Sequence, residues 1–135
     1  MRRSMAQTGA LVFGAAFLLV GVLGLFVHNG MAMEADNETA GKLLGLFPVN
    51  LLHNIVHLAF GVWGILASRS HAASRGYGRV GAVIYAVLVV MAFVDPTTFG
   101  LVPIGGNDIW LHAVLAAGLA YIGFAARDTT AHARV

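Results

Sequence analysis

The stretch that decides the fold is the apolar run from Leu11 to Val27, LVFGAAFLLVGVLGLFV, which contains no charged side chain. Such a run is typical of a helix that crosses a membrane, because about 20 apolar residues span a hydrocarbon core of about 30 Å. The whole chain shares this character: of its 135 residues, 59% are hydrophobic and only 10% are charged. So few charges cannot cover the apolar side chains of a small water-soluble domain, so we expect an integral membrane protein.

Three further apolar segments predict that residues 1–135 form a single domain, an all-α membrane bundle of four helices. We place the spans at about residues 9–28, 48–68, 77–94 and 108–126. Residues 39–47, TAGKLLGLF, are mildly amphipathic, and we expect an interfacial turn there before Pro48 opens the second helix. A secretory signal peptide is the alternative for the first run, but no convincing small-x-small cleavage site follows it.

The charged side chains predict the orientation of these spans. Arginines precede the first span, fill the loop after the second and follow the fourth, whereas the other two loops are acidic, with Lys42 as their only basic residue. The positive-inside rule then places both termini in the cytoplasm. The arginines follow this topology, so they do not indicate nucleic-acid binding. The expected partner is the lipid bilayer, and a homo-oligomer or a membrane complex stays open.

The second and fourth spans resemble one another. Leu52-His53 is followed at a fixed spacing by Gly64, and Leu111-His112 is followed at the same spacing by Gly123. Two helical hairpins in the same orientation would form a parallel repeat about an axis along the membrane normal. The repeat predicts that His53 and His112 lie at equivalent depth on related helices.

Polar residues of the second span fall on one helical face. Their offsets of three, four and seven place Asn50, His53, Asn54 and His57 on one stripe. On the fourth span Asp108 and His112 form a matching stripe, and His28 and Asp95 close the outer ends of the first and third spans. Ionisable side chains inside a span are costly and mark a functional site by default. We therefore expect these groups to gather in the outer third of the bundle.

The histidine spacing indicates a metal site. His53 and His57 lie one helical turn apart, so both imidazoles can reach one ion, and His112 would supply a third nitrogen. Asp108 is expected as the fourth ligand or as an orienting carboxylate, and Asp95 or His28 could also supply the fourth ligand. Three imidazoles with a carboxylate or water suit zinc, and could also suit copper or iron. The chain has no cysteine, so a thiolate site is excluded. The residues expected to support or orient these ligands are Asn50, Asn54, His28 and Asp95.

Several alternatives stay open at this stage. The cluster could be a hydrogen-bond network that locks the second helix against the fourth, a proton relay, or a quinone or small-molecule site. Two histidines facing one another could also ligate a haem, although the bundle is small for a porphyrin. Asp108 could be a helix N-cap, and Asn50 could cap its own helix or pin a loop. HNIVH lacks the glutamate of the H-E-x-x-H metalloprotease motif, and whether the protein is an enzyme stays open.

The strings LFPVNLLHNIVHLAFG (residues 46–61) and DIWLHAVLAAGLAYIG (residues 108–123) resemble a family of small bacterial four-helix membrane proteins. That family is known only as a domain of unknown function. The resemblance covers about residues 8–126, and its most specific part is the Asn-x-x-His-Asn-x-x-His block. It implies a location in the bacterial inner membrane and agrees with four spans, and it implies no activity.

Overall fold

Four helices contain most of the residues that the computed structural model describes, which are residues 3–127. These helices are α1 (Met5–Phe26), α2 (Leu51–Ala67), α3 (His71–Val94) and α4 (Asn107–Ala120), and α4 continues as a π-helix, η1 (Tyr121–Ala125). By length and composition, α1, α3 and α4 with η1 can each cross a membrane, whereas α2 is apolar but has only 17 residues. The prediction of membrane-type helices is confirmed, and three of the four reach full length.

Polar caps set where three of the helices begin. The Ser4 hydroxyl accepts a hydrogen bond from the Gln7 backbone N–H, and the Gln7 side chain accepts one from Ser4 N–H. Asn50 caps α2 and Ser70 caps α3 in the same way, because a side-chain oxygen satisfies a free N–H of the first turn. As a result, α2 begins at Leu51, and α3 begins at His71, before the segment from about residue 77 that was predicted to cross the membrane.

The segment before α2 forms a β-hairpin, in which β1 (Gly41–Leu43) pairs with β2 (Phe47–Val49) in antiparallel fashion. Leu44 and Gly45 close the turn with positive φ angles of 56° and 72°. Pro48 lies within β2 and does not open the helix, which corrects the expectation of an interfacial turn that leads directly into α2.

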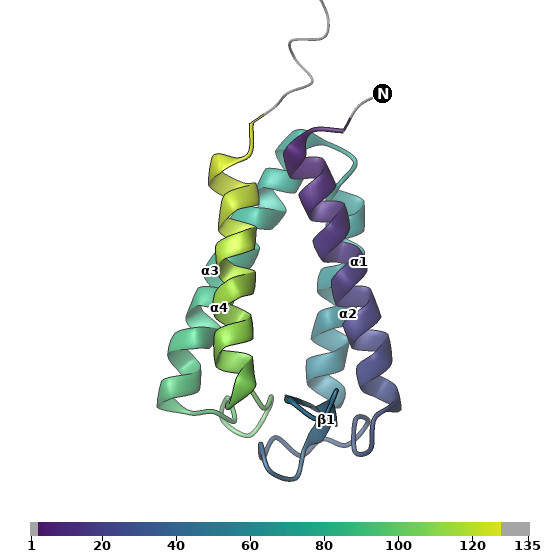
Figure 1. The fold of residues 1–135 in the computed structure, drawn as a ribbon, viewed down its shortest axis with the longest axis vertical. Helices are drawn as coiled ribbons and strands as arrows, with labels where there is room; N and C mark the ends of the chain where they lie inside the picture. Colours follow the sequence, from purple (N-terminus) through teal and green to yellow (C-terminus); the bar gives the residue numbers. More distant parts are fainter. Residues whose placement is uncertain (1–2, 128–135) are drawn as a thin grey trace, which may run out of the picture.

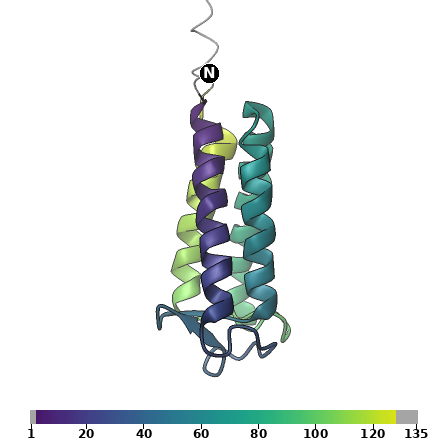
Figure 2. The same cartoon turned by 90° about the vertical axis from the view of Figure 1, so that its right-hand side faces the viewer.

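The helices run alternately up and down the long axis of the molecule. Figure 1 shows α1 beside α2 on the right and α3 beside α4 on the left, and the view in Figure 2 shows that all four follow the same axis. Residues 27–50 and 95–106 lie together at the lower end, which we call the loop end. Residues 3–5, 68–70 and 121–127 lie at the upper end, which we call the terminal end.

Glycines let the helices of each pair come into backbone contact. A methyl group on Gly14 of α1 would lie 2.7 Å from the backbone nitrogen of Ile65 in α2. A methyl group on Gly78 of α3 would lie 2.5 Å from the backbone nitrogen of Gly123 in η1. Small residues at such crossings are typical of membrane helices, which pack by close contact.

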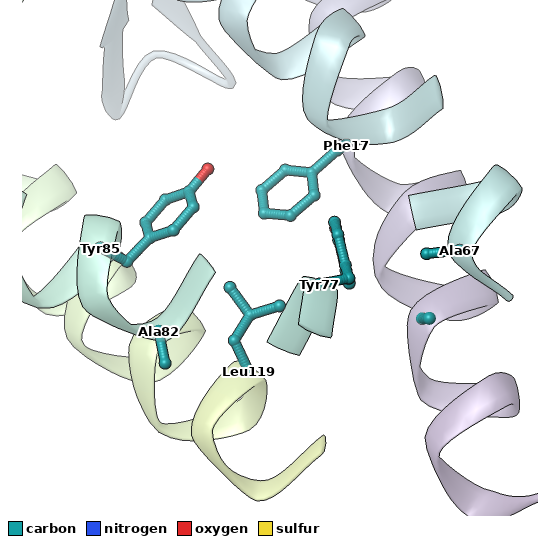
Figure 3. Close-up of a cluster of buried hydrophobic side chains, with 7 residues drawn as sticks. Phe17, Ala67, Tyr77, Ala82, Tyr85 and Leu119 are labelled. Carbon is teal, nitrogen blue, oxygen red and sulfur yellow. The ribbon is translucent and has the colours of Figure 1, made fainter. Parts of the chain in front are cut away.

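Aromatic side chains fill the space between the two helix pairs. Phe17 of α1 stacks on Tyr85 of α3 with ring centroids 5.6 Å apart, and both side chains are buried. Figure 3 shows these two rings with Tyr77 and Leu119, which come from α3 and α4. This core joins the pair α1–α2 to the pair α3–α4, so it fixes how α2 faces α4.

Asparagine side chains tie the two loops of the loop end together. The Asn37 amide donates to the carbonyl of Pro96 and accepts from the N–H of Gly105, at 3.0 and 2.8 Å. Asn107 donates to the carbonyl of Leu46 at 3.2 Å. The connection between α1 and α2 is thereby held against the connection between α3 and α4.

Candidate metal centre

Three buried imidazoles meet between α2 and α4, near the loop end. His53 and His57 lie one turn apart on α2, and His112 faces them from α4. One ring nitrogen from each of the three residues lies within 4.8 Å of the other two. The ring centroid of His53 is 4.5 Å from that of His57 and 6.0 Å from that of His112. The structure therefore brings together the three histidines that the helical spacing predicted as ligands.

Four polar atoms of this cluster lack hydrogen-bond partners among the described residues. The Nδ1 atoms of all three imidazoles and Oδ2 of Asp108 are buried and unpaired. The Asp108 oxygen lies 3.9 Å from His53 Nδ1. A buried polar atom without a partner costs about 1–3 kcal/mol, so four such atoms at one place are explained best by a partner that they share.

Asp108 lies inside the first turn of α4 and does not cap it. Gly106 precedes the helix with a φ of 62°, and no side chain caps this end. The side chain of Asp108 is only 3% exposed and turns towards His53. The N-cap alternative for Asp108 is wrong, so its carboxylate is available to the cluster.

The amides of Asn50 and Asn54 bond to the backbone and not to the imidazole rings. Asn50 Oδ1 accepts from the backbone N–H of His53, and Nδ2 donates to the carbonyl of Leu101 at 2.8 Å. Asn54 Nδ2 donates to the carbonyl of Gly30 at 2.9 Å. Asn50 thus caps α2 and pins a loop, as the second interpretation of its position predicted. Both amides fix the start of α2 under the loops.

The structure does not bring His28 and Asp95 into contact with the three imidazoles. His28 is exposed just beyond the end of α1. Asp95 accepts hydrogen bonds within its own turn, from the hydroxyl and N–H of Thr97 at 2.6 and 2.9 Å and from Phe99 N–H at 3.0 Å. These bonds, chiefly that of the Thr97 hydroxyl, hold the pKa of Asp95 below its usual value. Asp95 therefore shapes the turn after α3.

Two aromatic residues lie beside the cluster and were not predicted from the sequence. The ring of Tyr85 meets that of His112 edge to face, with centroids 5.2 Å apart. Phe17 packs against His57 with centroids 5.6 Å apart. The only sequence signal was a tyrosine in the middle of an apolar span, and nothing distinguishes Phe17 from its apolar neighbours.

Comparison with known protein families shows to which family the chain belongs. The family model described as "Domain of unknown function (DUF4383)" matches residues 7–125, so the chain belongs to that family. The match runs from α1 to the end of η1, and it confirms the predicted membership of a family of unknown function. No curated protein and no solved structure matches the chain significantly. A function must therefore be argued from the histidine cluster itself.

Proposed function

We propose that His53, His57 and His112 bind one transition-metal ion inside the helical bundle, with Asp108 as the fourth ligand. The observation that carries this proposal is that three buried imidazoles converge while each keeps an unpaired Nδ1. A metal ion satisfies several lone pairs at once, which no single side chain in contact with the cluster does.

The spacing of the donor atoms suits an ion after a small adjustment. Zinc binds imidazole nitrogen at about 2.0–2.1 Å, so two ligands of a tetrahedral site lie about 3.3 Å apart. The ligand nitrogens of the three histidines lie within 4.8 Å of one another. Rotations that move each ring nitrogen by about 1 Å would close the site around an ion.

The donor set favours zinc, and it also fits copper or iron. Three imidazoles and one carboxylate can form a tetrahedral site of nitrogen and oxygen ligands, and zinc adopts this geometry readily. A haem fits less well, because Phe17 and Tyr85 pack directly against His57 and His112 and occupy space that a porphyrin would need. Zinc is therefore the first ion to test.

We place this centre in the bacterial inner membrane, near its extracytoplasmic face, with both termini in the cytoplasm. At the terminal end, Arg69, Arg75 and Arg79 follow α2 or lie in the first turns of α3. Glu34, Asp36 and Glu38 lie in the loops of the other end. The positive-inside rule supports this orientation. His53 and His112 would then lie at corresponding positions of two hairpins in a parallel repeat.

The rival function is a structural or interaction subunit in which the same polar groups lock α2 against α4. The bonds of Asn50 and Asn54 to loop carbonyls favour this alternative, because they show that part of the polar stripe has a structural role. In that case water molecules would pair the imidazoles and Asp108.

Metal content distinguishes the two functions. The full chain is purified in detergent, loaded with zinc, copper or iron(II) in turn, dialysed, and analysed by mass spectrometry of the elements and by absorbance in the Soret region. We expect about one ion per chain for the wild type and a loss of stoichiometric metal in His57→Ala and His112→Ala, since each substitution removes one of the four ligands.

His28→Ala is the matched control, because His28 is exposed and outside the cluster. This variant should retain the metal content of the wild type. If the wild type binds no more of any of these metals than His57→Ala does, and both cluster variants only lower thermal stability, the cluster is a locking network and the proposal fails.

A further inference from the structure

At the terminal end, two arginines of α3 share one backbone oxygen. Arg75 Nε and Arg79 Nε each donate a hydrogen bond to the carbonyl of Gly123, both at 3.0 Å. Arg75 Nη2 also donates to the carbonyl of Phe124 at 3.1 Å. The two guanidinium groups are therefore held side by side by the end of η1.

The backbone explains why the arginines gather at this point. Gly123 and Phe124 lie in the last turn of η1, where carbonyl groups lack partners within the helix. The close approach of Gly78 to Gly123 brings the first turns of α3 against this turn. The negative end of the helix dipole also attracts cations.

These contacts leave the positive charges unbalanced. A carbonyl is a dipole and does not neutralise two guanidinium groups, whose like charges repel one another at short distance. The acidic residues of the described range all lie in the loops of the loop end or in the first turn of α4, and they are Glu34, Asp36, Glu38, Asp95 and Asp108. Arg69 and Arg127, both exposed, add further positive charge at the terminal end. Residues 3–127 therefore supply no carboxylate to balance these arginines.

Three guanidinium nitrogens of the two arginines remain free to donate to an anion. The carbonyls engage Nε and Nη2 of Arg75 and Nε of Arg79, so Nη1 of Arg75 and both Nη atoms of Arg79 have no bond within the described residues. Guanidinium groups bind phosphate oxygens through two parallel N–H bonds.

An exposed aromatic ring beside the arginines indicates a lipid and not free phosphate. Arg79 Cζ lies 5.6 Å from the centroid of the Phe124 ring, and Phe124 is 61% exposed. A charged headgroup joined to an acyl chain would meet both features, with the phosphate on the arginines and the chain along Phe124.

We propose that Arg75 and Arg79, held on the Gly123 carbonyl, form a binding site for the phosphate of an anionic phospholipid. This site lies at the end of the bundle opposite to the histidine cluster and does not depend on a metal there.

Native mass spectrometry of the full chain with phosphatidylglycerol tests the proposal. The wild type should retain one phosphatidylglycerol molecule in preference to phosphatidylcholine, and inorganic phosphate should not compete. Retention should fall about tenfold in Arg79→Gln and further in Arg75→Gln/Arg79→Gln, because each loses charge-assisted hydrogen bonds. If the double glutamine variant fails to fold, Arg75→Lys/Arg79→Lys takes its place in the test. This variant keeps the charge but loses the paired donors, so it should also retain less lipid than the wild type.

Arg69→Gln is the matched control, because it removes an exposed arginine from the same end and should leave lipid retention unchanged. Equal retention by the wild type and by the Arg79 variants would overturn the proposal, and so would competition by inorganic phosphate. Asp128→Asn should bind phosphatidylglycerol as the wild type does. Binding several-fold tighter in that variant would show that Asp128 is the anion that balances the arginines, and this result would also overturn the proposal.

Discussion

Asp108 combines three properties that rarely occur together in an apolar helix. It lies in the first turn of α4, it is buried, and its Oδ2 has no hydrogen-bond partner among the described residues. The positive end of the helix dipole favours a negative charge at this position. A carboxylate there can complete a metal site without a further residue from the loops.

We expect Asp108→Asn to fold but to bind zinc at least about tenfold more weakly, because the amide is a poorer ligand and carries no charge, and loss of even an outer-shell partner costs that much. Titration of the purified protein against a competing chelator measures the affinity. Asp95→Asn is the control, since the carboxylate of Asp95 is engaged by Thr97 and Phe99 in its own turn. Equal zinc affinity in Asp108→Asn and the wild type would exclude Asp108 as a ligand.

At this scale the sequence predicted the convergence of the three histidines better than it predicted their surroundings. His53 and His57 were predictable because residues four apart share a helix face, and His112 because it lies at the corresponding place in the fourth span. The partners of Asn50 and Asn54 are carbonyls of residues 101 and 30, which helical spacing cannot relate to α2. The sequence could not reveal this distant pairing, because it depends on the path of the loops.

The contact between α1 and α2 depends on glycine. Gly14 faces the backbone of α2, where the nearest atoms to an added methyl group would be Ile65 N at 2.7 Å and Gly61 O at 2.9 Å. Backbone atoms cannot rotate away as side chains do. The two helices would have to separate to admit a larger residue.

Gly14→Ala should therefore lower the free energy of unfolding by about 1–3 kcal/mol, as overpacking does in other tightly packed interiors. Reversible unfolding in mixed detergent, followed by circular dichroism, measures the change. Gly76→Ala in α3 is the control, because no heavy atom lies within 4 Å of the added methyl group. It should be neutral or should stabilise the helix by up to about 1 kcal/mol. Similar losses in both variants would mean that the α1–α2 contact does not require glycine.

Apolar length predicted the existence of the helices, and polar caps decided where α1, α2 and α3 begin. Ser70 extends α3 back to His71, across a polar turn that hydropathy assigned to a loop. The β-hairpin was not predicted, since its turn depends on the backbone of Leu44 and Gly45 more than on any pattern of apolar residues.

On the scale of the molecule, the histidine cluster joins two helix pairs. His53 and His57 belong to the pair α1–α2, and His112 belongs to the pair α3–α4. Close backbone contact occurs within each pair, at Gly14 and at Gly78, whereas side chains make the junction between pairs. A bound ion would therefore cross-link the two halves.

Removal of the metal should loosen the loop end. An ion present at 100 times its dissociation constant stabilises the folded state by about 2.7 kcal/mol, so a chelator should lower the melting temperature. The chain contains no cysteine, so spin labels can be attached at Ile55→Cys and Val114→Cys, two exposed positions on α2 and α4. Chelation should broaden the distribution of distances between the two spin labels. His57→Ala should show the broad distribution with or without chelator, and an unchanged distribution in the otherwise native protein would show that no ion joins the halves.

The short length of α2 has a consequence for the surrounding lipid. At 1.5 Å per residue its 17 residues extend over about 25 Å, whereas a hydrocarbon layer measures about 30 Å. Lipids beside α2 would thin to match it, and this would draw polar headgroups and their water towards the loops that cover its buried N-cap, Asn50. A hydrated cation approaching from the loop end would then meet the first imidazole, His53, without crossing the full depth of the acyl chains.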